Sequence, residues 1–351
     1  HNHQVSLIAD VVFNHNSGAD AQEVNPLINQ ARWTLFNPKS GKFPRNWECF
    51  HPCMYESWDN MTFGDMPDLA HRNPYVYAEL LKLARWLIED IGFDGFRYDF
   101  VKGYGADTIT AVQEYRYQRD GKQFVPYGVA EFWDNAHAIE NWVDLANFSN
   151  TNPVEAFDFP QREMLKAMCD SYGFSLKNLT TWDTVVRREE QNAVSFVENH
   201  DLRDEGRPII NDKLLAYSYI LTHEGYPCVF WHDYFNLNLA LGDTPNGIVA
   251  LVDAHEKYAG GDTNVLYVDD NLYVMQREGY ADQPGLIYVL NNRGDNWNGK
   301  LVTTKWTNAS FAPVAWWSKS DLSRPINQST DRDGRAQFYA PPRGYAVYAM
   351  R

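Results

Sequence analysis

Phe93-Asp-Gly-Phe-Arg-Tyr-Asp-Phe100 decides the fold, because here a short, largely apolar run carries charged side chains at its end. Side chains alternate between the two faces of a strand, so Arg97 and Asp99 share one face and the aromatic residues share the other. The aromatic face is suited to pack against helices. The stretch therefore predicts a buried strand with an arginine and a carboxylate at its C-terminal end.

On either side of this stretch, short apolar runs alternate with amphipathic runs of helix length, a pattern typical of parallel β/α units. Asn73-Pro74 predicts a helix start, apolar residues recur at helical spacing from Val76 to Ile91, and Gly92 predicts the helix end. The apolar runs predict six strands, each part of one β/α unit: 5–13, 93–100, 124–131, 155–159, 193–200 and 226–231.

The composition restricts the class of protein. The 351 residues are 44% hydrophobic and 22% charged, which is typical of a globular protein. A net charge of −15 argues against a nucleic-acid partner, and no apolar run reaches the ~18 residues of a membrane span. Aromatic residues make up 15%, including 12 Trp and 21 Tyr, which suits a cleft that stacks sugar rings.

Four of the predicted strands end in polar residues, and in barrel folds the C-terminal strand ends build the active site. Asp10 and Asn14 share one face of the first strand, Glu131 ends another, and Asn199 and Asp201 share a face further on. Singly, each of these residues is typical of a turn, a helix cap or an ion pair. Together with Arg97 and Asp99 they predict carboxylates that converge at one barrel mouth.

Cleavage of a glycosidic bond needs two carboxyl groups, a nucleophile and a general acid, about 5 to 5.5 Å apart in a retaining mechanism. The nucleophile must stay ionised, and Asp99 has Arg97 beside it to favour the charged form. The acid must hold a proton, which apolar neighbours favour. Glu131, followed by Phe132 and Trp133, is the natural candidate.

Four motifs resemble the ordered sequence regions of the α-amylase family (glycoside hydrolase family 13), with its archaeal and plant-type members most similar. The four motifs are Asp10-Val-Val-Phe-Asn-His15, Gly95-Phe-Arg-Tyr-Asp99, Val129-Ala-Glu131 and Phe196-Val-Glu-Asn-His-Asp201. The resemblance implies a nucleophile, a general acid/base and a third carboxylate that stabilises the transition state: Asp99, Glu131 and Asp201. It also implies that five side chains bind the sugar: His15, Arg97, Lys102, Trp133 and His200. A packing role for Trp133 is equally consistent with the sequence.

The resemblance further implies a structural calcium ion, held by oxygen atoms of Asn14, Asp59 and Asp68 and by the backbone carbonyl of Gly103. Asp65 is an alternative to either aspartate. Met66-Pro-Asp-Leu departs from the family's more usual Leu-Pro-Asp-Leu, which leaves the linkage preference open. Nearby, Cys49 and Cys53 flank His51 and are compatible with a local disulfide or with a metal site.

The implied fold is an α/β (β/α)8 TIM barrel, of which strands 3 to 8 are expected in this chain. We expect the barrel over 1–14 and 72–263, an inserted domain B with the calcium site over 15–71, and a C-terminal antiparallel β-sandwich over 264–351. Alternating runs and Asn-Gly turns in the last region support that assignment. Because six strands cannot close an eight-stranded barrel, we expect this sequence to be the larger piece of a longer chain, which is either cut or incomplete. In a cut protein, the N-terminal segment with the first two βα units would be a partner as a separate chain.

The resemblance implies retaining endo-hydrolysis of α-1,4-glucosidic bonds in starch, glycogen and maltooligosaccharides, through a covalent glucosyl-enzyme intermediate. Two alternatives stay open: an exo-acting α-glucosidase or transglycosylase of the same family, and an inactive glucan-binding fragment. The family also implies an extracellular or periplasmic location, although no signal peptide precedes Val5 in this sequence.

Overall fold

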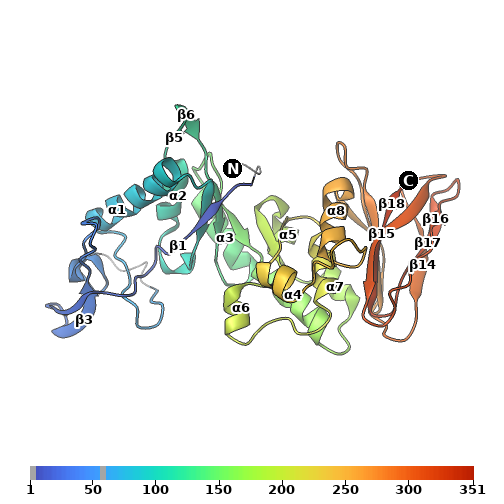
Figure 1. Ribbon diagram of the computed structural model, residues 1–351, viewed down its shortest axis with the longest axis horizontal. Helices are drawn as coiled ribbons and strands as arrows, with labels where there is room; N and C mark the ends of the chain where they lie inside the picture. Colours follow the sequence, from blue (N-terminus) through green and yellow to red (C-terminus); the bar gives the residue numbers. More distant parts are fainter. Residues whose placement is uncertain (1–4, 56–60) are drawn as a thin grey trace. The chain divides into compact units, whose positions relative to one another are not determined.

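The computed structural model describes residues 5–55 and 61–351, which divide into two compact units, His1–Phe157 and Asp158–Arg351. Both units contribute parallel strands of a TIM-type barrel, six in all, and the second unit adds an antiparallel β domain (Figure 1). The predicted fold class is therefore confirmed. Among the described residues, no helix is both long and apolar enough to cross a membrane.

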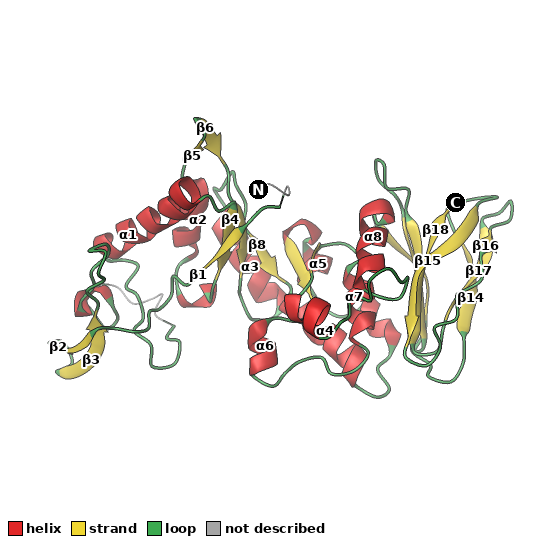
Figure 2. Ribbon diagram, viewed as in Figure 1, coloured by secondary structure: helices red, strands yellow, loops and turns green. Residues whose placement is uncertain are grey.

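The first unit is built around four parallel strands in the order β1-β4-β7-β8, with helices between them in the chain (Figure 2). The register sets Asp10 of β1 beside Arg97 of β4, and Arg97 beside Val129 of β7. The elements of this unit are β1 Ile8–Val11, β2 Ala21–Asn25, β3 Gln30–Leu35, η1 Trp47–Cys49, α1 Pro74–Arg85, η2 Trp86–Ile91, β4 Gly95–Tyr98, η3 Val101–Gly103, α2 Ala106–Glu114, β5 Tyr117–Arg119, β6 Lys122–Phe124, β7 Tyr127–Ala130, α3 Ala136–Asn147 and β8 Glu155–Phe157.

The helical segment formed by α1 and η2 starts and ends where the sequence predicts. The Asn73 side chain accepts a hydrogen bond from the Tyr75 N–H, and Pro74 occupies the first helical position. The chain then changes to a π-helical turn, η2, before Gly92 ends it at φ 95°. Only this π-helical turn was not predicted.

The segment between β1 and α1 contains the β2–β3 hairpin and the short helix η1. It is joined to the end of β1 by the isolated bridge between His15 and Asp68, and the Leu69 N–H donates 2.8 Å to the Asn14 carbonyl. These backbone contacts place the polar residues after β1 against the end of the insertion. The exact boundaries of the expected domain B stay a prediction.

The second unit begins with helices and two parallel strands, β9 and β10, and continues into the antiparallel domain. Its elements are α4 Phe159–Asp170, η4 Leu176–Thr180, α5 Val185–Arg188, η5 Glu190–Asn192, β9 Ala193–Phe196, α6 His200–Asp204, α7 Lys213–Ile220, β10 Tyr226–Cys228, η6 His232–Asn236, α8 Ile248–Tyr258, β11 Thr263–Val268, β12 Leu272–Arg277, β13 Leu286–Asn291, β14 Asn298–Thr303, β15 Ser310–Ser318, β16 Gln328–Ser329, β17 Arg335–Ala340 and β18 Gly344–Met350.

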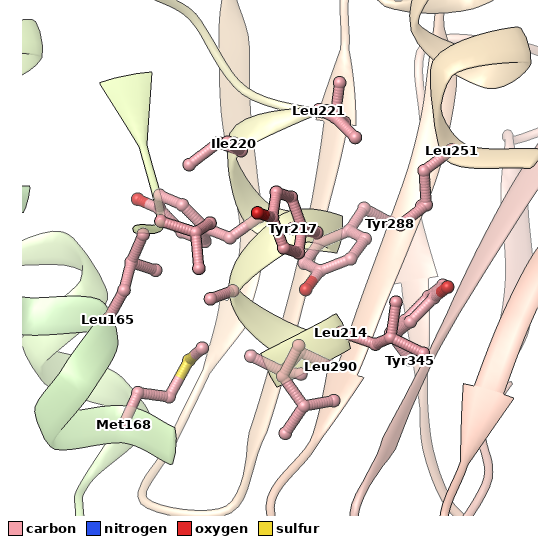
Figure 3. Close-up of a cluster of buried hydrophobic side chains, with 14 of the residues drawn as sticks. Leu165, Met168, Leu214, Tyr217, Ile220, Leu221, Leu251, Tyr288, Leu290 and Tyr345 are labelled. Atoms are coloured by element: carbon pink, nitrogen blue, oxygen red, sulfur yellow. The ribbon is translucent and has the colours of Figure 1, made fainter. Parts of the chain in front are cut away.

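The antiparallel domain has a six-stranded sheet, β11-β12-β13-β18-β15-β16, and a two-stranded sheet, β14-β17. Alternate residues of its strands supply two cores: Leu272 and Val274 join β14 and β17, whereas Tyr273 and Met275 join helices α4, α7 and α8. Figure 3 shows the second core, where Tyr288 and Tyr345 lie among leucines of the helices. Burial of both faces of the sheet attaches this domain firmly to the helices that precede it.

Candidate active site

Arg97 and Asp99, the charged residues that the sequence analysis places at a strand end, lie at the C-terminal end of β4. Strand β4 lies between β1 and β7, so side chains from all three neighbouring strands reach the same edge of the sheet. Phe96 and Tyr98 are fully buried, and the Tyr98 hydroxyl donates 2.9 Å to Gln113 of α2. The predicted division into an aromatic face toward the helices and a polar face is confirmed for these two residues.

One guanidinium connects three carboxylates at this edge. Arg97 Nη1 lies 2.8 Å from Asp10 Oδ1 and 2.5 Å from Asp99 Oδ1, and Nη2 lies 2.9 Å from Glu131 Oε2. We call these four residues the Arg97 cluster. Burial disfavours the charge on Arg97, but the carboxylates of Glu131, Asp10 and Asp99 outweigh burial and raise the pKa of Arg97. The cluster keeps a fixed positive charge between its acids.

The backbone after β4 also holds Glu131. The Phe100 N–H donates a hydrogen bond of 3.1 Å to Glu131 Oε2, and Phe100 has a left-handed conformation with φ 45°. The sequence predicted that the strand runs to Phe100, which is wrong, because β4 ends at Tyr98 and the chain turns. The Phe63 ring packs edge-on against Phe100 with centroids 5.2 Å apart, which supports this strained turn.

His15 lies beside the insertion, as a residue at the end of β1 should. Its ring stacks on Phe63 with centroids 4.6 Å apart and an interplanar angle of 5°. Burial lowers the pKa of His15, and the nearby Asp99 carboxylate opposes this only in part. His15 is therefore neutral at pH 7, and a neutral imidazole is able to donate and accept hydrogen bonds with a sugar hydroxyl.

Lys102 follows the turn and is already engaged by a carboxylate. Its Nζ lies 2.7 Å from Asp134 Oδ2 and 3.2 Å from the Trp133 carbonyl. The Lys102 hydrogen bond lowers the pKa of Asp134, so this pair is ionised at neutral pH. Trp133 is partly buried in the loop after β7. The structure thus positions Lys102 and Trp133 near each other, and their sugar contacts stay predictions.

Three of the four expected calcium ligands lie among the described residues. Asn14 and Asp68 are both 0% exposed, and Asn14 Oδ1 accepts no hydrogen bond from any residue that the structure describes. Gly103 lies so close to this oxygen that a Cβ there would overlap it. The fourth expected ligand, Asp59, lies outside the described residues, and the alternative Asp65 is exposed.

Cys49 and Cys53 are free thiols, so the disulfide interpretation is not supported. Within residues 5–55 and 61–351, no group of three or more His, Cys, Asp or Glu side chains is arranged to hold a metal ion. The metal interpretation of His51 and its two cysteines therefore also lacks support. The oxygen-rich position at Asn14 differs in kind, since amide and backbone oxygens contribute to it.

His200 and Asp201 lie in the second unit, at the start of α6, where Asn199 caps the helix by accepting from the Leu202 N–H. The two side chains face each other, with His200 Nε2 3.4 Å from Asp201 Oδ1, and both are more than a third exposed. Asp99 and Glu131 lie in the first unit, so the convergence of Asp201 on them stays a prediction.

Two contributors to the site were missed. Phe63 contacts both His15 and Phe100, and the Phe100 amide holds Glu131. No pattern of residue spacing in the sequence indicates Phe63 or Phe100. Phe63 lies in an irregular loop, and Phe100 acts through its backbone amide. Asp10 was expected at the barrel mouth, but its direct contact with Arg97 follows only from the strand register.

Two protein-family models match this chain, and one of them covers the candidate active site. Residues 1–230 match the family model described as the α-amylase catalytic domain, and residues 286–349 match the model for the α-amylase C-terminal domain. The first match spans the ends of β1, β4 and β7 together with α6. It therefore includes every residue of the Arg97 cluster as well as Asp201.

Individual proteins of the α-amylase family are also similar to this chain. The chain is 29% identical to the glucan 1,4-α-maltohexaosidase of Bacillus sp. (strain 707), over 84% of this chain and 67% of that protein. It is 28% identical to the α-amylase of Bacillus licheniformis, over 85% and 70% respectively. The crystal structure of the α-amylase from Geobacillus thermoleovorans complexed with acarbose superposes with a TM-score of 0.68 at 19% identity, covering 100% of this chain and 78% of that one.

Proposed function

Because the chain belongs to the α-amylase family of glycoside hydrolases, we propose that it hydrolyses internal α-1,4-glucosidic bonds of starch-type glucans with retention of configuration. A single observation carries this proposal: Arg97 holds the carboxylates of Asp99 and Glu131 at one strand edge. Two carboxyl groups on one guanidinium fit the short separation of a retaining pair better than the wider separation of an inverting pair.

In the first step, an Asp99 carboxylate oxygen attacks the anomeric carbon while Glu131 gives its proton to the departing glycosidic oxygen. The product is a covalent glucosyl ester on Asp99 and a shortened glucan chain. In the second step, Glu131 takes a proton from water, and the water attacks the same carbon and releases Asp99. The Arg97 guanidinium lies beside the attacking carboxylate of Asp99, and the Phe100 amide fixes the orientation of Glu131.

The remaining family roles belong to the same proposal. Asp201 and His200 would hydrogen-bond sugar hydroxyls and favour the distorted, cation-like transition state. His15 would also bind the sugar at the cleaved bond. Lys102 and Trp133 would contact the glucan beside the cleaved bond. An extracellular or periplasmic location is also proposed, and it follows from the family alone.

A time course on amylose tests the endo-acting proposal. We expect viscosity to fall before small sugars accumulate, and the first products to carry the α configuration. Early release of glucose or maltose at constant viscosity would favour an exo-acting enzyme instead, and products longer than the supplied chains would favour a transglycosylase. No turnover at all would favour a glucan-binding fragment.

We also propose that calcium binds at the end of β1. Asn14 offers a buried amide oxygen that accepts no hydrogen bond from the described residues, Asp68 adds a buried carboxylate, and Gly103 lets the backbone approach. When bound, the ion would join β1 to the insertion. Excess chelator should then lower the unfolding temperature, and re-added calcium should restore it. An unchanged melting curve would contradict this proposal.

A further inference from the structure

Phe63 joins two parts of the candidate active site that lie far apart in the sequence. Its ring stacks on the His15 ring, with centroids 4.6 Å apart and an interplanar angle of 5°. The same ring packs edge-on against Phe100, with centroids 5.2 Å apart and an angle of 74°. His15 follows β1 and Phe100 follows β4, so one side chain of the insertion contacts the ends of two neighbouring strands. Aromatic contacts of this kind are able to hold the two strand ends in one arrangement.

The chain on both sides of Phe63 is bonded to the segment that follows β1. Two residues before Phe63, the Met61 carbonyl accepts a hydrogen bond of 3.2 Å from the Asn14 side-chain amide. Four residues after Phe63, the Pro67 carbonyl accepts a hydrogen bond of 3.0 Å from the Asn16 N–H. The segment after β1 therefore holds the loop of Phe63 at two points, which keeps the ring at this strand end.

The residue that Phe63 packs against has a costly backbone conformation. Phe100 has φ 45° and ψ 48°, in the left-handed region that bulky side chains rarely adopt. Such a conformation persists where surrounding contacts hold it, and the Phe63 ring is one of these contacts. In this conformation the Phe100 N–H donates a hydrogen bond of 3.1 Å to Glu131 Oε2. An unusual turn thus supplies a hydrogen-bond donor to the proposed general acid.

The backbone of Glu131 is held by neighbouring backbone, whereas its carboxyl group depends on Arg97 and on the Phe100 amide. The Glu131 N–H donates 2.9 Å to the Tyr98 carbonyl, and the Val101 N–H donates 3.1 Å to the Glu131 carbonyl. The carboxyl oxygen Oε2 lies 2.9 Å from Arg97 Nη2 and 3.1 Å from the Phe100 nitrogen. Both contacts hold the same oxygen, so loss of the amide bond would loosen the position of the carboxyl group.

We propose that Phe63 is a positioning residue for the general acid: its ring holds the turn at Phe100 and so keeps the Phe100 amide on Glu131. This inference rests on the proposed function, because Glu131 acts as the acid in that mechanism. Phe63 acts only through Phe100 here and makes no contact with the reacting atoms. A proton donor must lie within hydrogen-bond reach of the departing oxygen. A small displacement of Glu131 therefore slows a bond cleavage that needs a proton and spares one that does not.

Two substrates with different leaving groups test this proposal. Cleavage of maltopentaose needs a proton on the departing sugar oxygen, whereas fluoride leaves α-maltotriosyl fluoride with little help from an acid. We compare kcat/KM, because it covers the steps up to the covalent intermediate, in which Glu131 gives its proton. Phe63→Ala should lower kcat/KM by about tenfold or more on maltopentaose and by less than about threefold on the fluoride.

Three further variants control this measurement. Phe63→Tyr keeps the ring and should restore most of the loss on maltopentaose. Phe63→Leu keeps an apolar side chain without a ring, and it should show the same selective loss if Phe63→Ala folds poorly. Trp33→Ala is the matched control, because Trp33 is another exposed aromatic residue of the insertion, in β3, and it should leave both values unchanged.

Equal losses on the two substrates would overturn the inference, because Phe63 would then act on folding or, through His15, on a sugar that both substrates contain. Unchanged kcat/KM on maltopentaose would overturn it as well. Glu131→Gln should also spare the fluoride. An equal loss in that variant, or no hydrolysis of either substrate by the wild type, would instead reject the proposed function.

A crystal structure of Phe63→Ala decides on the inference in that case too, since it needs no turnover. The inference predicts that the Phe100 amide is displaced from Glu131. A hydrogen bond that stays at 3.1 Å would contradict it.

Discussion

Two charged clusters in this chain differ in composition and in exposure. The Arg97 cluster sets one cation against three carboxylates, and the Asp10 side chain in it is 54% exposed. In the second unit, Arg162 and Lys213 face Glu198 and Asp233, and all four side chains are at most 9% exposed. We call these four residues the Arg162 network. Its Arg162–Glu198 contact is 3.1 Å, and Lys213 lies 2.8 Å from Asp233.

The differences in charge balance and exposure indicate different roles for the two clusters. Charges that are matched and buried satisfy one another and fix the packing of α4, α7 and η6. An excess of carboxylates at an accessible strand edge gains no such stability, since like charges repel. The Arg97 cluster keeps that excess at a strand edge where the Asp10 side chain is exposed to solvent. We therefore expect removal of charge to affect activity in the Arg97 cluster and stability in the Arg162 network.

The largest expected effect is on activity. Glu131→Gln and Asp99→Asn should each lower kcat on soluble starch by roughly 10³-fold or more, because the proton donor or the nucleophile is lost while shape is kept. Their unfolding temperatures should stay within a few degrees of the wild type, as two acids remain on Arg97. A variant that keeps a tenth of the activity would show that its residue has another role. Asp10→Asn, at the exposed edge, is the matched control and should lose less.

The Arg162 network should show the opposite pattern. Glu198→Gln leaves Arg162 and Lys213 buried with less compensation, which should cost about 3–5 kcal/mol and lower the unfolding temperature by roughly 10 °C. Glu163→Gln is the control, because Glu163 also contacts Arg162 but is 37% exposed. Scanning calorimetry with activity at low temperature separates the effects. A stable but inactive Glu198→Gln would contradict the comparison.

A smaller effect on stability should appear on acidification, at the buried side chain of His223. Burial lowers the pKa of His223 from 6.5 to about 4, with the Glu224 carboxylate opposing the shift. The folded protein thus keeps His223 neutral while the unfolded chain binds a proton below about pH 6.5. The free energy of unfolding should therefore fall as pH drops from 6.5 to 4, by up to about 3 kcal/mol.

Urea unfolding of the wild type and His223→Gln at pH 7 and pH 4.5 measures this contribution. The wild type should lose more stability than the variant. Asp158 changes stability in the opposite sense in both proteins, because burial raises the pKa of its carboxyl to about 6. The contribution of Asp158 therefore cancels when the pH dependence of the variant is subtracted from that of the wild type. Equal pH dependence in the two proteins would rule out His223 as the acid-sensitive group.

The smallest expected effect concerns Tyr217, which donates a hydrogen bond to Asp233 of the Arg162 network. The Tyr217 hydroxyl donates 2.7 Å to Asp233 Oδ2, and Tyr217→Phe would leave that buried oxygen with one hydrogen bond fewer. The loss should be about 1–2 kcal/mol without any change in activity. Thermal unfolding measures it. Tyr345→Phe, which removes a buried hydroxyl from the same core, offers the comparison, and a larger loss there would reverse the expected order.

Local signals predicted much of this fold. The Asn73-Pro74 start and the Gly92 end of the helix depend on residues that sit next to each other, and alternation along β4 depends on the pleat. The π-helical turn η2 and the left-handed turn at Phe100 were not predictable, because distant residues support both. Arg119 donates a hydrogen bond to the Ile88 carbonyl of η2, and the Phe63 ring packs against Phe100. Phe63 illustrates the same limit: no period or motif places an insertion residue over His15.

For the candidate site, the residue types were predictable and most contacts were not. Parity indicated that Arg97 and Asp99 share a face, but the strand register decides that Arg97 also meets Asp10 and Glu131. The engagement of Lys102 by Asp134 depends on the course of the loop after β7. Motif resemblance identified Asp201, whose position relative to Asp99 and Glu131 stays a prediction.

Trapping of the glucosyl-enzyme intermediate tests the central claim most directly. The protein would be incubated with a 5-fluoro-α-glucosyl fluoride, which forms the covalent ester faster than water removes it, and then digested for peptide mass spectrometry. We predict a single added fluoroglucosyl group on the peptide that carries Asp99, and none in Asp99→Asn. A label on Glu131 or on any other side chain would contradict the assignment of the Arg97 cluster.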